Sequence, residues 1–127
     1  MNIRRGEIYW VNLDPVIGSE IGKKRPVIII SNNKNNEFAN TVNIIPLTSE
    51  NLKKTYPHEV LITKGDGNLE KNSKAKCDQI RTIDKKRLLG LIGEINKDTL
   101  KRIEIAIKIQ FDLMTQNDRL DSIPSLL

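Results

Sequence analysis

The chain is poor in the residues that most often build disulfides and metal sites. Its 127 residues include one cysteine, Cys77, and one histidine, His58. A single cysteine cannot form an internal disulfide, and one cysteine with one histidine cannot supply a Cys/His zinc site within one chain. We therefore expect Cys77 to be a small, inert core residue. We also expect the protein to need no metal and no cofactor.

Long apolar segments are missing as well. No run approaches the roughly 18 apolar residues that a membrane span requires. The N-terminus, residues 1–6, lacks the apolar core of a signal peptide. We therefore expect a cytoplasmic protein without a membrane partner. The net charge of +5 at pH 7 favours a polyanion as the partner instead.

Aromatic residues make up only 4% of the chain, and β-branched residues dominate its apolar runs. Short runs of this kind between turn residues predict strands at 7–13, 27–31, 41–47, 59–63, around 75–77 and at 88–95. The run after Pro26 does not alternate, which is typical of a strand covered on both faces. Trp10 is expected in the core, and Pro46 indicates that its strand ends, or lies at an edge, near that point.

The C-terminal part of the chain has the spacing of one long helix. Asn96 is a good N-cap, and two apolar stripes follow it. The first stripe contains Leu100, Ile103, Ile107, Phe111 and Met114, and the second contains Ile105, Ile109 and Leu113. The first should pack on the strands, and the second is either core or a subunit interface.

These elements predict a mainly β fold with α structure. We expect a small, strongly bent antiparallel sheet or partly open barrel, with one C-terminal helix packed on it. One domain should span residues 1–114. Residues 115–127 then form a C-terminal extension of unknown structure.

Familiar catalytic sets are absent, but one pair suits phosphate. The chain has no Walker-type phosphate loop, no histidine pair and no evident carboxylate cluster at metal-binding spacing. Arg25 opens one predicted strand and Thr48 closes the next, so adjacent antiparallel strands would bring both to one end of the sheet. The arginine fork binds two phosphate oxygens, and a threonine hydroxyl can bond a third. RNA supplies its own 2′-hydroxyl nucleophile, so the pair fits metal-free phosphodiester chemistry. A non-catalytic nucleic-acid-binding barrel fits these residues equally well.

Five short blocks, taken together and in order, resemble the MazF/PemK family of toxin endoribonucleases from bacterial toxin–antitoxin modules. They are RGEIY at 5–9, LDPVIGSE at 13–20, KRPVIIISN at 24–32, PLTS at 46–49 and DQIRTIDKKRL at 78–88. The resemblance covers roughly residues 4–114. It implies an SH3-like barrel with a C-terminal helix, working as a homodimer.

The resemblance also implies an activity and its residues. Single-stranded RNA, such as mRNA, would be cleaved at a short sequence without metal, leaving 2′,3′-cyclic phosphate and 5′-hydroxyl ends. Arg25 and Thr48 would be catalytic. The resemblance places the loop at 18–24 and Gln79 beside the RNA, and the polar side chains of His58 and Arg81 are added from the residues themselves. The residues expected to contact RNA are thus Ser19, Glu20, Lys23, Lys24, His58, Gln79 and Arg81. A cognate antitoxin would block the same groove with an acidic C-terminal segment.

Three alternatives stay open at this point. A toxin of the same fold could poison a protein target, such as a topoisomerase, without cutting RNA. The general base could be Arg25, Glu20 or water, because an arginine normally stays protonated and is a poor base. His58 could be a plain surface residue or a proton shuttle.

Overall fold

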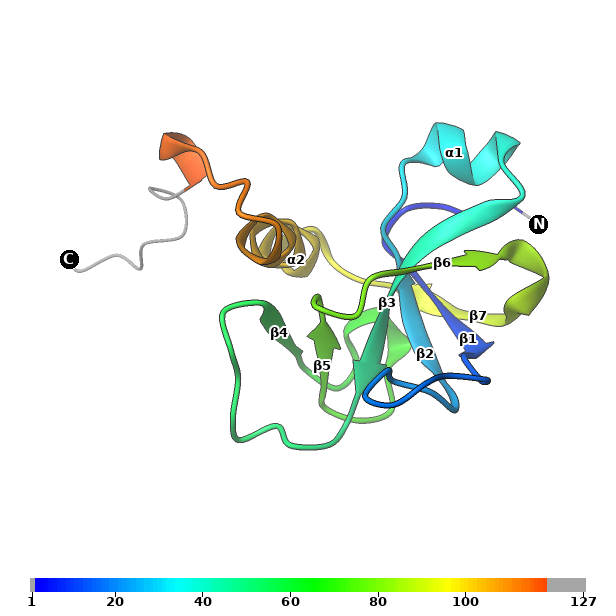
Figure 1. Cartoon of the computed structure of the whole chain (residues 1–127), viewed down its shortest axis with the longest axis horizontal. Coiled ribbons are helices and arrows are strands. Elements are labelled where there is room, and N and C mark those ends of the chain that lie inside the picture. The colour runs from blue at the N-terminus through cyan, green and yellow to red at the C-terminus, as the bar shows by residue number, and fades with distance from the viewer. Residues whose placement is uncertain (1, 119–127) are drawn as a thin grey trace.

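The computed structural model describes residues 2–118 and shows a seven-stranded antiparallel sheet (Figure 1). Its strands are β1 (Glu7–Asn12), β2 (Lys24–Ile29), β3 (Thr41–Thr48), β4 (Glu59–Ile62), β5 (Ser73–Lys76), β6 (Arg81–Asp84) and β7 (Leu88–Glu94). The helices are α1 (Asn33–Phe38) and α2 (Lys97–Gln110), with single 3₁₀ turns at η1 (Asp66–Asn68) and η2 (Lys85–Arg87). The mainly β fold with a C-terminal helix is confirmed.

The strands follow the order β4-β5-β3-β2-β1-β7, and β6 pairs separately with β3. In the part of the chain that the structure describes, the terminal strands β4 and β7 do not pair with each other. The sheet is thus strongly bent but open, which agrees with the predicted bent sheet or partly open barrel. Of the predicted C-terminal extension, 115–127, residues from 119 onward lie outside the described residues.

Strand β2 is buried on both faces, as its unbroken apolar run predicts. Val27 and Ile29 pack into one core cluster with Tyr9 of β1. Ile28 points the other way, into a second cluster with Ile45 of β3. All three β2 side chains are fully buried. Burial of this kind contributes about 1.5–3 kcal/mol for each large aliphatic side chain, so the strand that carries Arg25 is firmly anchored.

Strand β3 is the centre of the sheet rather than its edge. It pairs with β6 through 41–44, with β2 through 44–46 and with β5 through Leu47 and Thr48. Pro46 therefore does not lie in an edge strand, which corrects one of the two expectations drawn from it, but the strand does end near Pro46, as the other states. Proline is tolerated because it lies where β3 passes from its β2 partner to its β5 partner. The strand ends two residues later, at Thr48.

Helix α2 packs on the sheet with its first apolar stripe. Asn96 caps it as predicted, because its side chain accepts a hydrogen bond from the Thr99 N–H at 2.8 Å. Ile103 is fully buried, and Leu100 and Ile107 pack against the same cluster. The helix ends at Gln110, so Phe111 and Met114 lie beyond it.

The second stripe of α2 is not core. Ile105 is half-buried, whereas Ile109 is 38% and Leu113 61% exposed. The sequence left two hypotheses for this stripe, core or subunit interface, and only the subunit interface is compatible with that exposure. Among the described residues, no helix is both long and apolar enough to cross a membrane.

Candidate active site

The antiparallel pairing of β2 and β3 brings Arg25 and Thr48 to one end of the sheet. Val27 lies opposite Pro46, and Ile28 lies opposite Ile45. Continuing this register places Arg25 beside the end of β3. Its Nη1 donates to the Leu47 carbonyl at 3.2 Å, and its Nε donates to the Gly22 carbonyl at 2.7 Å. The guanidinium is thus fixed by two backbone carbonyls, and its other N–H donors remain for a ligand.

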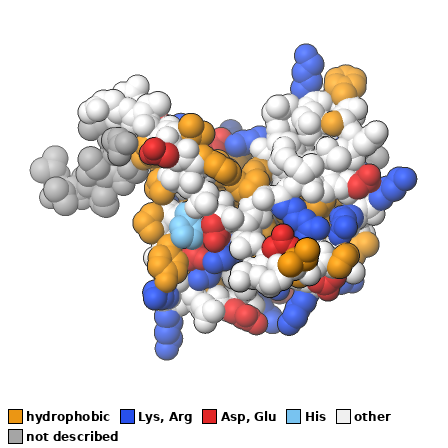
Figure 2. Space-filling view, in the orientation of Figure 1, with side chains coloured by type: hydrophobic (Ala, Val, Ile, Leu, Met, Phe, Trp, Pro, Cys, Tyr) orange, Lys and Arg blue, Asp and Glu red, His pale blue; other side chains and the backbone are white. Residues whose placement is uncertain are grey.

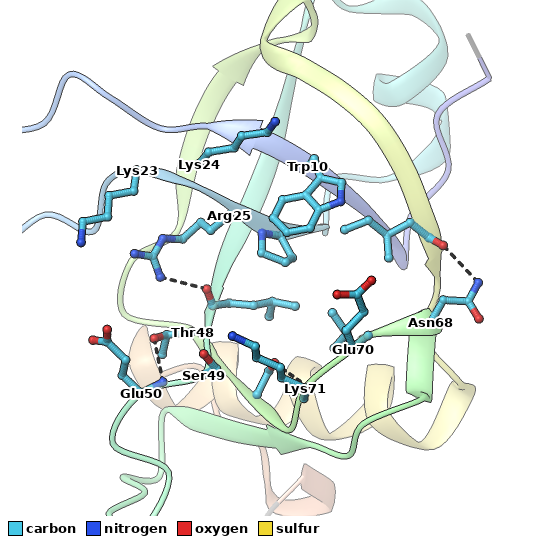
Figure 3. Close-up of a pocket in the computed structure, with 15 residues that line it drawn as sticks. Trp10, Lys23, Lys24, Arg25, Thr48, Ser49, Glu50, Asn68, Glu70 and Lys71 are labelled. Carbon is cyan, nitrogen blue, oxygen red and sulfur yellow. Dashed lines mark hydrogen bonds between the residues drawn. The ribbon is translucent and has the colours of Figure 1, made fainter.

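Thr48 has an oriented hydroxyl. Its Oγ1 accepts a hydrogen bond from the Glu50 N–H at 3.1 Å, and the residue is half-buried. Because the oxygen already accepts this bond, the hydroxyl hydrogen is free to be donated outward. Figure 3 shows Arg25, Thr48 and Glu50 on the same side of the site. A phosphate oxygen near Thr48 would meet two kinds of donor there, one charged and one neutral.

Both residues line a cavity of about 360 Å³. It is bounded by Trp10, Lys23, Lys24, Arg25, Pro26, Leu47, Thr48, Ser49, Glu50, Asn68, Leu69, Glu70, Lys71, Ser73 and Ile92. Four cations and two carboxylates are present, so the lining has a positive balance that suits an anionic ligand. Figure 2 shows one face of the molecule, on which Lys and Arg lie among acidic and apolar side chains.

Trp10 is 39% exposed, so its expected place in the core is wrong. It pairs with Pro26 of β2 and with Gly90 of β7. The β1–β2 register is unbroken, and side chains alternate along this part of β1: Tyr9 and Val11 are buried, whereas Trp10 and Asn12 are exposed, so Trp10 lies on the face of β1 that the core leaves uncovered there. The indole lies at the rim of the cavity instead (Figure 3), where an aromatic face can stack on a base.

The loop between β1 and β2 is built around Asp14. The Asp14 Oδ1 accepts from the Lys23 N–H at 2.9 Å, and the Leu13 N–H donates to the Lys23 carbonyl at 2.9 Å. Lys23 has a φ of 69°, the left-handed region. Lys23 and Lys24, both predicted to contact RNA, are exposed and line the cavity. Ser19 and Glu20 are exposed on the far part of the loop and do not line it.

Gln79 and Arg81 lie behind this loop rather than in the cavity. The Gln79 Oε1 accepts from the Ile21 N–H at 3.2 Å, and the Arg81 Nη1 donates to the Leu13 carbonyl at 2.8 Å. Both residues were expected to contact RNA, but in this structure they bond the backbone of the loop and hold it in place. Gln79 precedes β6 and Arg81 is its first residue, so this part of the chain is bonded to the loop that leads to Arg25.

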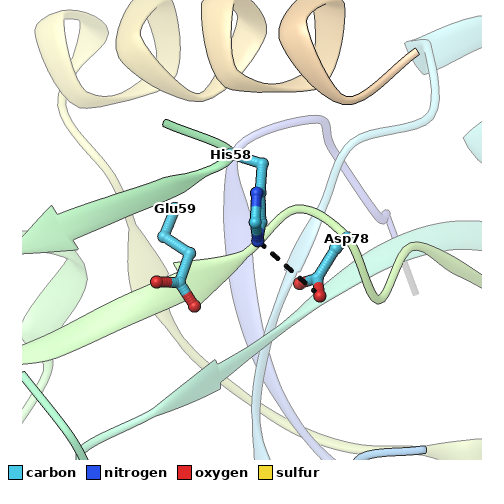
Figure 4. Close-up of side chains that lie close together, drawn as sticks. All are labelled: His58, Glu59 and Asp78. Atoms are coloured by element: carbon cyan, nitrogen blue, oxygen red, sulfur yellow. Dashed lines mark ion pairs between the residues drawn. The ribbon is translucent and has the colours of Figure 1, made fainter. Parts of the chain in front are cut away.

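His58 lies in a separate cluster with Glu59 and Asp78 (Figure 4). Its Nε2 is 3.7 Å from the Asp78 Oδ2, and its ring stacks on Tyr56 with 5.6 Å between centroids. The ligand atoms of the three residues all lie within 4.8 Å of one another, a cluster that the sequence spacing did not reveal. His58 is not part of the cavity lining.

This cluster is already neutralised by lysines. Glu59 is buried, and its two oxygens lie 3.3 Å from Lys74 Nζ and 2.5 Å from Lys76 Nζ. Burial alone would raise the pKa of Glu59, but hydrogen bonds from Lys76, the Tyr56 N–H and Lys74 lower it to about 2. The two lysines and the Tyr56 N–H therefore satisfy the Glu59 carboxylate without a metal ion.

Cys77 behaves as expected of a core thiol. It is fully buried between Lys76 and Asp78 in the chain. Burial raises its pKa to about 12, and the charges of Asp78 and Glu59 act in the same direction. The predicted core position is confirmed, and a thiol with a raised pKa is a poor nucleophile.

Comparison with known proteins gives concordant results. A family model described as PemK-like, MazF-like toxin of type II toxin–antitoxin system matches residues 4–111. The endoribonuclease MazF9 of Mycobacterium tuberculosis is 38% identical over 116 residues, covering 87% of this chain and 98% of that protein. The endoribonuclease EndoA of Bacillus subtilis is 34% identical over 114 residues, covering 90% and 98%.

Solved structures agree. An endoribonuclease in complex with its cognate antitoxin, from a mycobacterial species, has a TM-score of 0.75 at 25% identity, covering 89% of this chain and 98% of that chain. MazF from Deinococcus radiodurans has a TM-score of 0.76 at 24% identity, covering 88% and 98%, and shows the same fold.

Proposed function

The chain belongs to the family of PemK-like, MazF-like toxins of type II toxin–antitoxin systems, and we propose that it is a metal-independent, sequence-specific endoribonuclease acting on single-stranded RNA. Its relatives MazF9 and EndoA are both named endoribonucleases. The proposed substrate is mRNA, and the proposed site is the cavity between the ends of β2 and β3. We place this activity in the cytoplasm, where mRNA is found.

The observation that carries the proposal is the juxtaposition of Arg25 and Thr48. One is a fixed guanidinium with free donors, and the other is a hydroxyl oriented to donate. Together they can bind the non-bridging oxygens of one phosphodiester. Donors held in place before the reaction stabilise a phosphorane as its charge develops, without further reorganisation. The four cations of the lining supply the remaining attraction for the RNA backbone.

The reaction follows from RNA's own chemistry. The 2′-oxygen attacks the adjacent phosphorus while the bond from phosphorus to the 5′-oxygen breaks. The 2′-hydroxyl proton goes to a base, and the departing 5′-oxygen takes up a proton, which gives a 2′,3′-cyclic phosphate and a 5′-hydroxyl. Arg25 stabilises the phosphorane and can donate toward the 5′-oxygen, and Thr48 bonds a non-bridging oxygen.

The base in this scheme is Arg25, Glu20 or water. Arginine is a poor base because it normally stays protonated. Glu20 does not line the cavity, and its Oε1 accepts from the Ile17 N–H at 2.7 Å within the loop. Water bound near the Arg25 guanidinium fits this arrangement without moving the loop.

Lys23 and Lys24 are proposed to bind the RNA backbone directly, since both line the cavity. Ser19 and Glu20 would meet RNA only where it extends beyond the cavity along the loop. Gln79 and Arg81 are proposed to act by holding that loop, given their contacts with Ile21 and Leu13.

The proposed partners are a second copy of the chain and an antitoxin. A relative of similar fold is described in complex with its cognate antitoxin. An acidic C-terminal antitoxin segment would be complementary to the cations of the cavity and would exclude RNA from it. The exposed Ile109 and Leu113 favour a homodimer, because a monomer rarely leaves an apolar stripe uncovered.

The domain itself is proposed to be residues 1–114. The family match ends at residue 111, close to the end of α2. The described start of the extension is tied to α2, because Lys108 Nζ lies 2.5 Å from the Asp118 carboxylate.

Cleavage of a long, unstructured RNA by purified protein in excess EDTA tests the proposal. We expect cuts at a short sequence, with 2′,3′-cyclic phosphate ends identified by end-group analysis. Absence of cleavage by folded protein free of antitoxin would contradict the proposal. It would favour instead the toxin of the same fold that poisons a protein target such as a topoisomerase.

The substitution R25A separates catalysis from binding. Loss of one preorganised charged donor should lower the cleavage rate about a hundredfold or more. RNA affinity should change far less, because Lys23, Lys24 and Lys71 remain in the cavity. Single-turnover cleavage and RNA binding measure the two quantities, and R4A, an exposed arginine outside the cavity, is the control. Wild-type cleavage by R25A would rule out this site.

A further inference from the structure

Lys74 is a buried lysine directly beside the proposed catalytic threonine. It lies in β5, where its Cα is paired with that of Thr48 across the β3–β5 ladder. The residue is only 4% exposed. Burying an ammonium group is costly unless every donor finds a partner, so its contacts show what the charge is used for.

All three donors of the Lys74 ammonium have acceptors, and two of these are carbonyls of one loop. The Nζ donates to the Asn51 carbonyl at 3.0 Å and to the Lys54 carbonyl at 3.0 Å. The third acceptor is the Glu59 Oε1 at 3.3 Å, at the start of β4. The ammonium therefore joins the interior of the β3–β4 loop (residues 49–58) to the strand on which the loop ends.

The loop in turn holds the Thr48 hydroxyl. Asn51 has a φ of 54°, a left-handed conformation that needs support from its surroundings. The preceding residue, Glu50, donates its N–H to the Thr48 Oγ1 at 3.1 Å. A series of short contacts thus runs from the Lys74 ammonium through Asn51 and Glu50 to the hydroxyl that faces the cavity.

From these contacts we infer that Lys74 is a positioning residue for the cleavage reaction. It fixes the β3–β4 loop so that the Glu50 N–H occupies the Thr48 oxygen and the Thr48 hydrogen points to the substrate. The inference rests on the proposed function, because it assigns Lys74 a role in that reaction. Lys74 does not line the cavity and does not touch RNA in this scheme.

The substitution K74M removes the ammonium while keeping most of the side-chain volume. Glu59 is not left without partners, because Lys76 and the Tyr56 N–H still bond it. We expect kcat to fall about tenfold with KM little changed, since a small misplacement of a catalytic group costs rate rather than binding. The thermal unfolding midpoint and circular dichroism show that the variant is folded under the assay conditions.

K76M is the matched control. Lys76 lies two residues further along β5 and bonds the other oxygen of Glu59, so the change removes the same charge. Its ammonium pairs with Glu59 and Asp78 and, within residues 2–118, bonds no carbonyl of the loop. K76M should keep the wild-type kcat, whereas an equal loss in both variants would show that charge or stability is responsible and would overturn the inference.

A double-mutant cycle with T48A tests whether Lys74 acts through Thr48. If it does, K74M should lower kcat in the wild-type background and have little further effect in the T48A background. Full additivity of the two losses would overturn the inference, because it would mean that Lys74 works elsewhere.

Hydrogen exchange of the loop amides gives a readout that does not depend on RNA. Amides of residues 49–56 should exchange faster in K74M than in K76M or wild type, with strands β1 to β3 unchanged. Unchanged exchange in K74M overturns the inference whatever the protein does to RNA. Wild-type protein that fails to cleave RNA would instead contradict the proposed function, while the exchange result still decides whether Lys74 holds the loop.

Discussion

At the scale of single residues, Gly22 sets the position of Arg25. The Gly22 carbonyl accepts the hydrogen bond from Arg25 Nε at 2.7 Å. A Cβ at this position would lie 2.5 Å from the Asp14 Oδ1 and 2.9 Å from a Val16 methyl carbon. Asp14 holds the Lys23 N–H with that same oxygen. A side chain at residue 22 would therefore displace the loop that fixes the guanidinium.

The substitution G22A should therefore weaken both the fold and the site. We expect a loss of about 1–3 kcal/mol in the free energy of unfolding, the usual cost of overpacking. Cleavage should fall about tenfold through misplacement of Arg25. Urea unfolding and single-turnover cleavage measure the two effects.

G90A is the control for this prediction. A Cβ at Gly90 meets no heavy atom within 4 Å, so the change should stay within about 0.5 kcal/mol. Equal effects of G22A and G90A would show that loss of glycine alone, not the contact with Asp14, is responsible.

Residue patterns revealed some of the site and missed other parts. Arg25 and Thr48 could be paired from the sequence because Arg25 lies at the start and Thr48 at the end of two easily recognised strands. Lys74 could not, because its importance depends on the β3–β5 register, which no local pattern encodes. Trp10 was misplaced because alternation separates it from Tyr9 and Val11 but does not tell which of the two faces is covered, and at Trp10 the covered face is the other one.

At the scale of elements, ion pairs reinforce the antiparallel pairing of β4 with β5. Glu59 of β4 is bonded by Lys74 and Lys76 of β5, and its pKa is lowered from 4.5 to about 2. A carboxyl with a depressed pKa stabilises the folded state above its unfolded pKa, because there it is charged in both states and paired only in the folded one.

The Glu59 contribution should therefore be lost as the pH falls from about 4.5 to about 2. A shift of this size corresponds to roughly 3 kcal/mol of stability. Urea unfolding of wild type and E59Q between pH 2 and 6 checks this. The difference in stability between the two should be full near pH 6 and should shrink toward pH 2. A constant difference would refute the prediction. E37Q, which removes an exposed glutamate of α1 outside the β4–β5 pairing, is the control substitution.

In helix α2, the spacing of apolar residues does not show where the helix ends. The apolar spacing continues through Phe111 and Met114, but the helix ends at Gln110. Asp112 adopts a φ of 56°, and the Leu113 N–H donates to the Lys108 carbonyl at 2.7 Å. This left-handed cap closes the helix. Aspartate at such a position is a less distinctive helix-stop residue than glycine, so the end of the helix could not be read from the residue types.

At the scale of the whole molecule, the exposed end of α2 is a candidate contact between two copies. Ile109 is 38%, Phe111 54% and Leu113 61% exposed. We expect the double substitution I109S/L113S to weaken dimerisation at least about tenfold, because two apolar side chains would no longer be buried there. Sedimentation over a range of concentrations measures it.

F38S is the control for the dimer prediction. Phe38 is 74% exposed on α1, which lies away from α2 in Figure 1. It removes an exposed apolar side chain of similar kind without touching the stripe. Wild-type dimerisation of I109S/L113S, or equal weakening in F38S, would place the subunit contact elsewhere.

The central position of β3 also bears on the order in which the chain is made. Thr48 pairs with Lys74, and the loop before Arg25 is braced by Gln79 and Arg81. A chain still emerging from the ribosome therefore carries both Arg25 and Thr48 well before the residues that position them. The site can be completed only after β6 has left the exit tunnel, so the growing polypeptide should stay inactive toward RNA until most of the chain has been made.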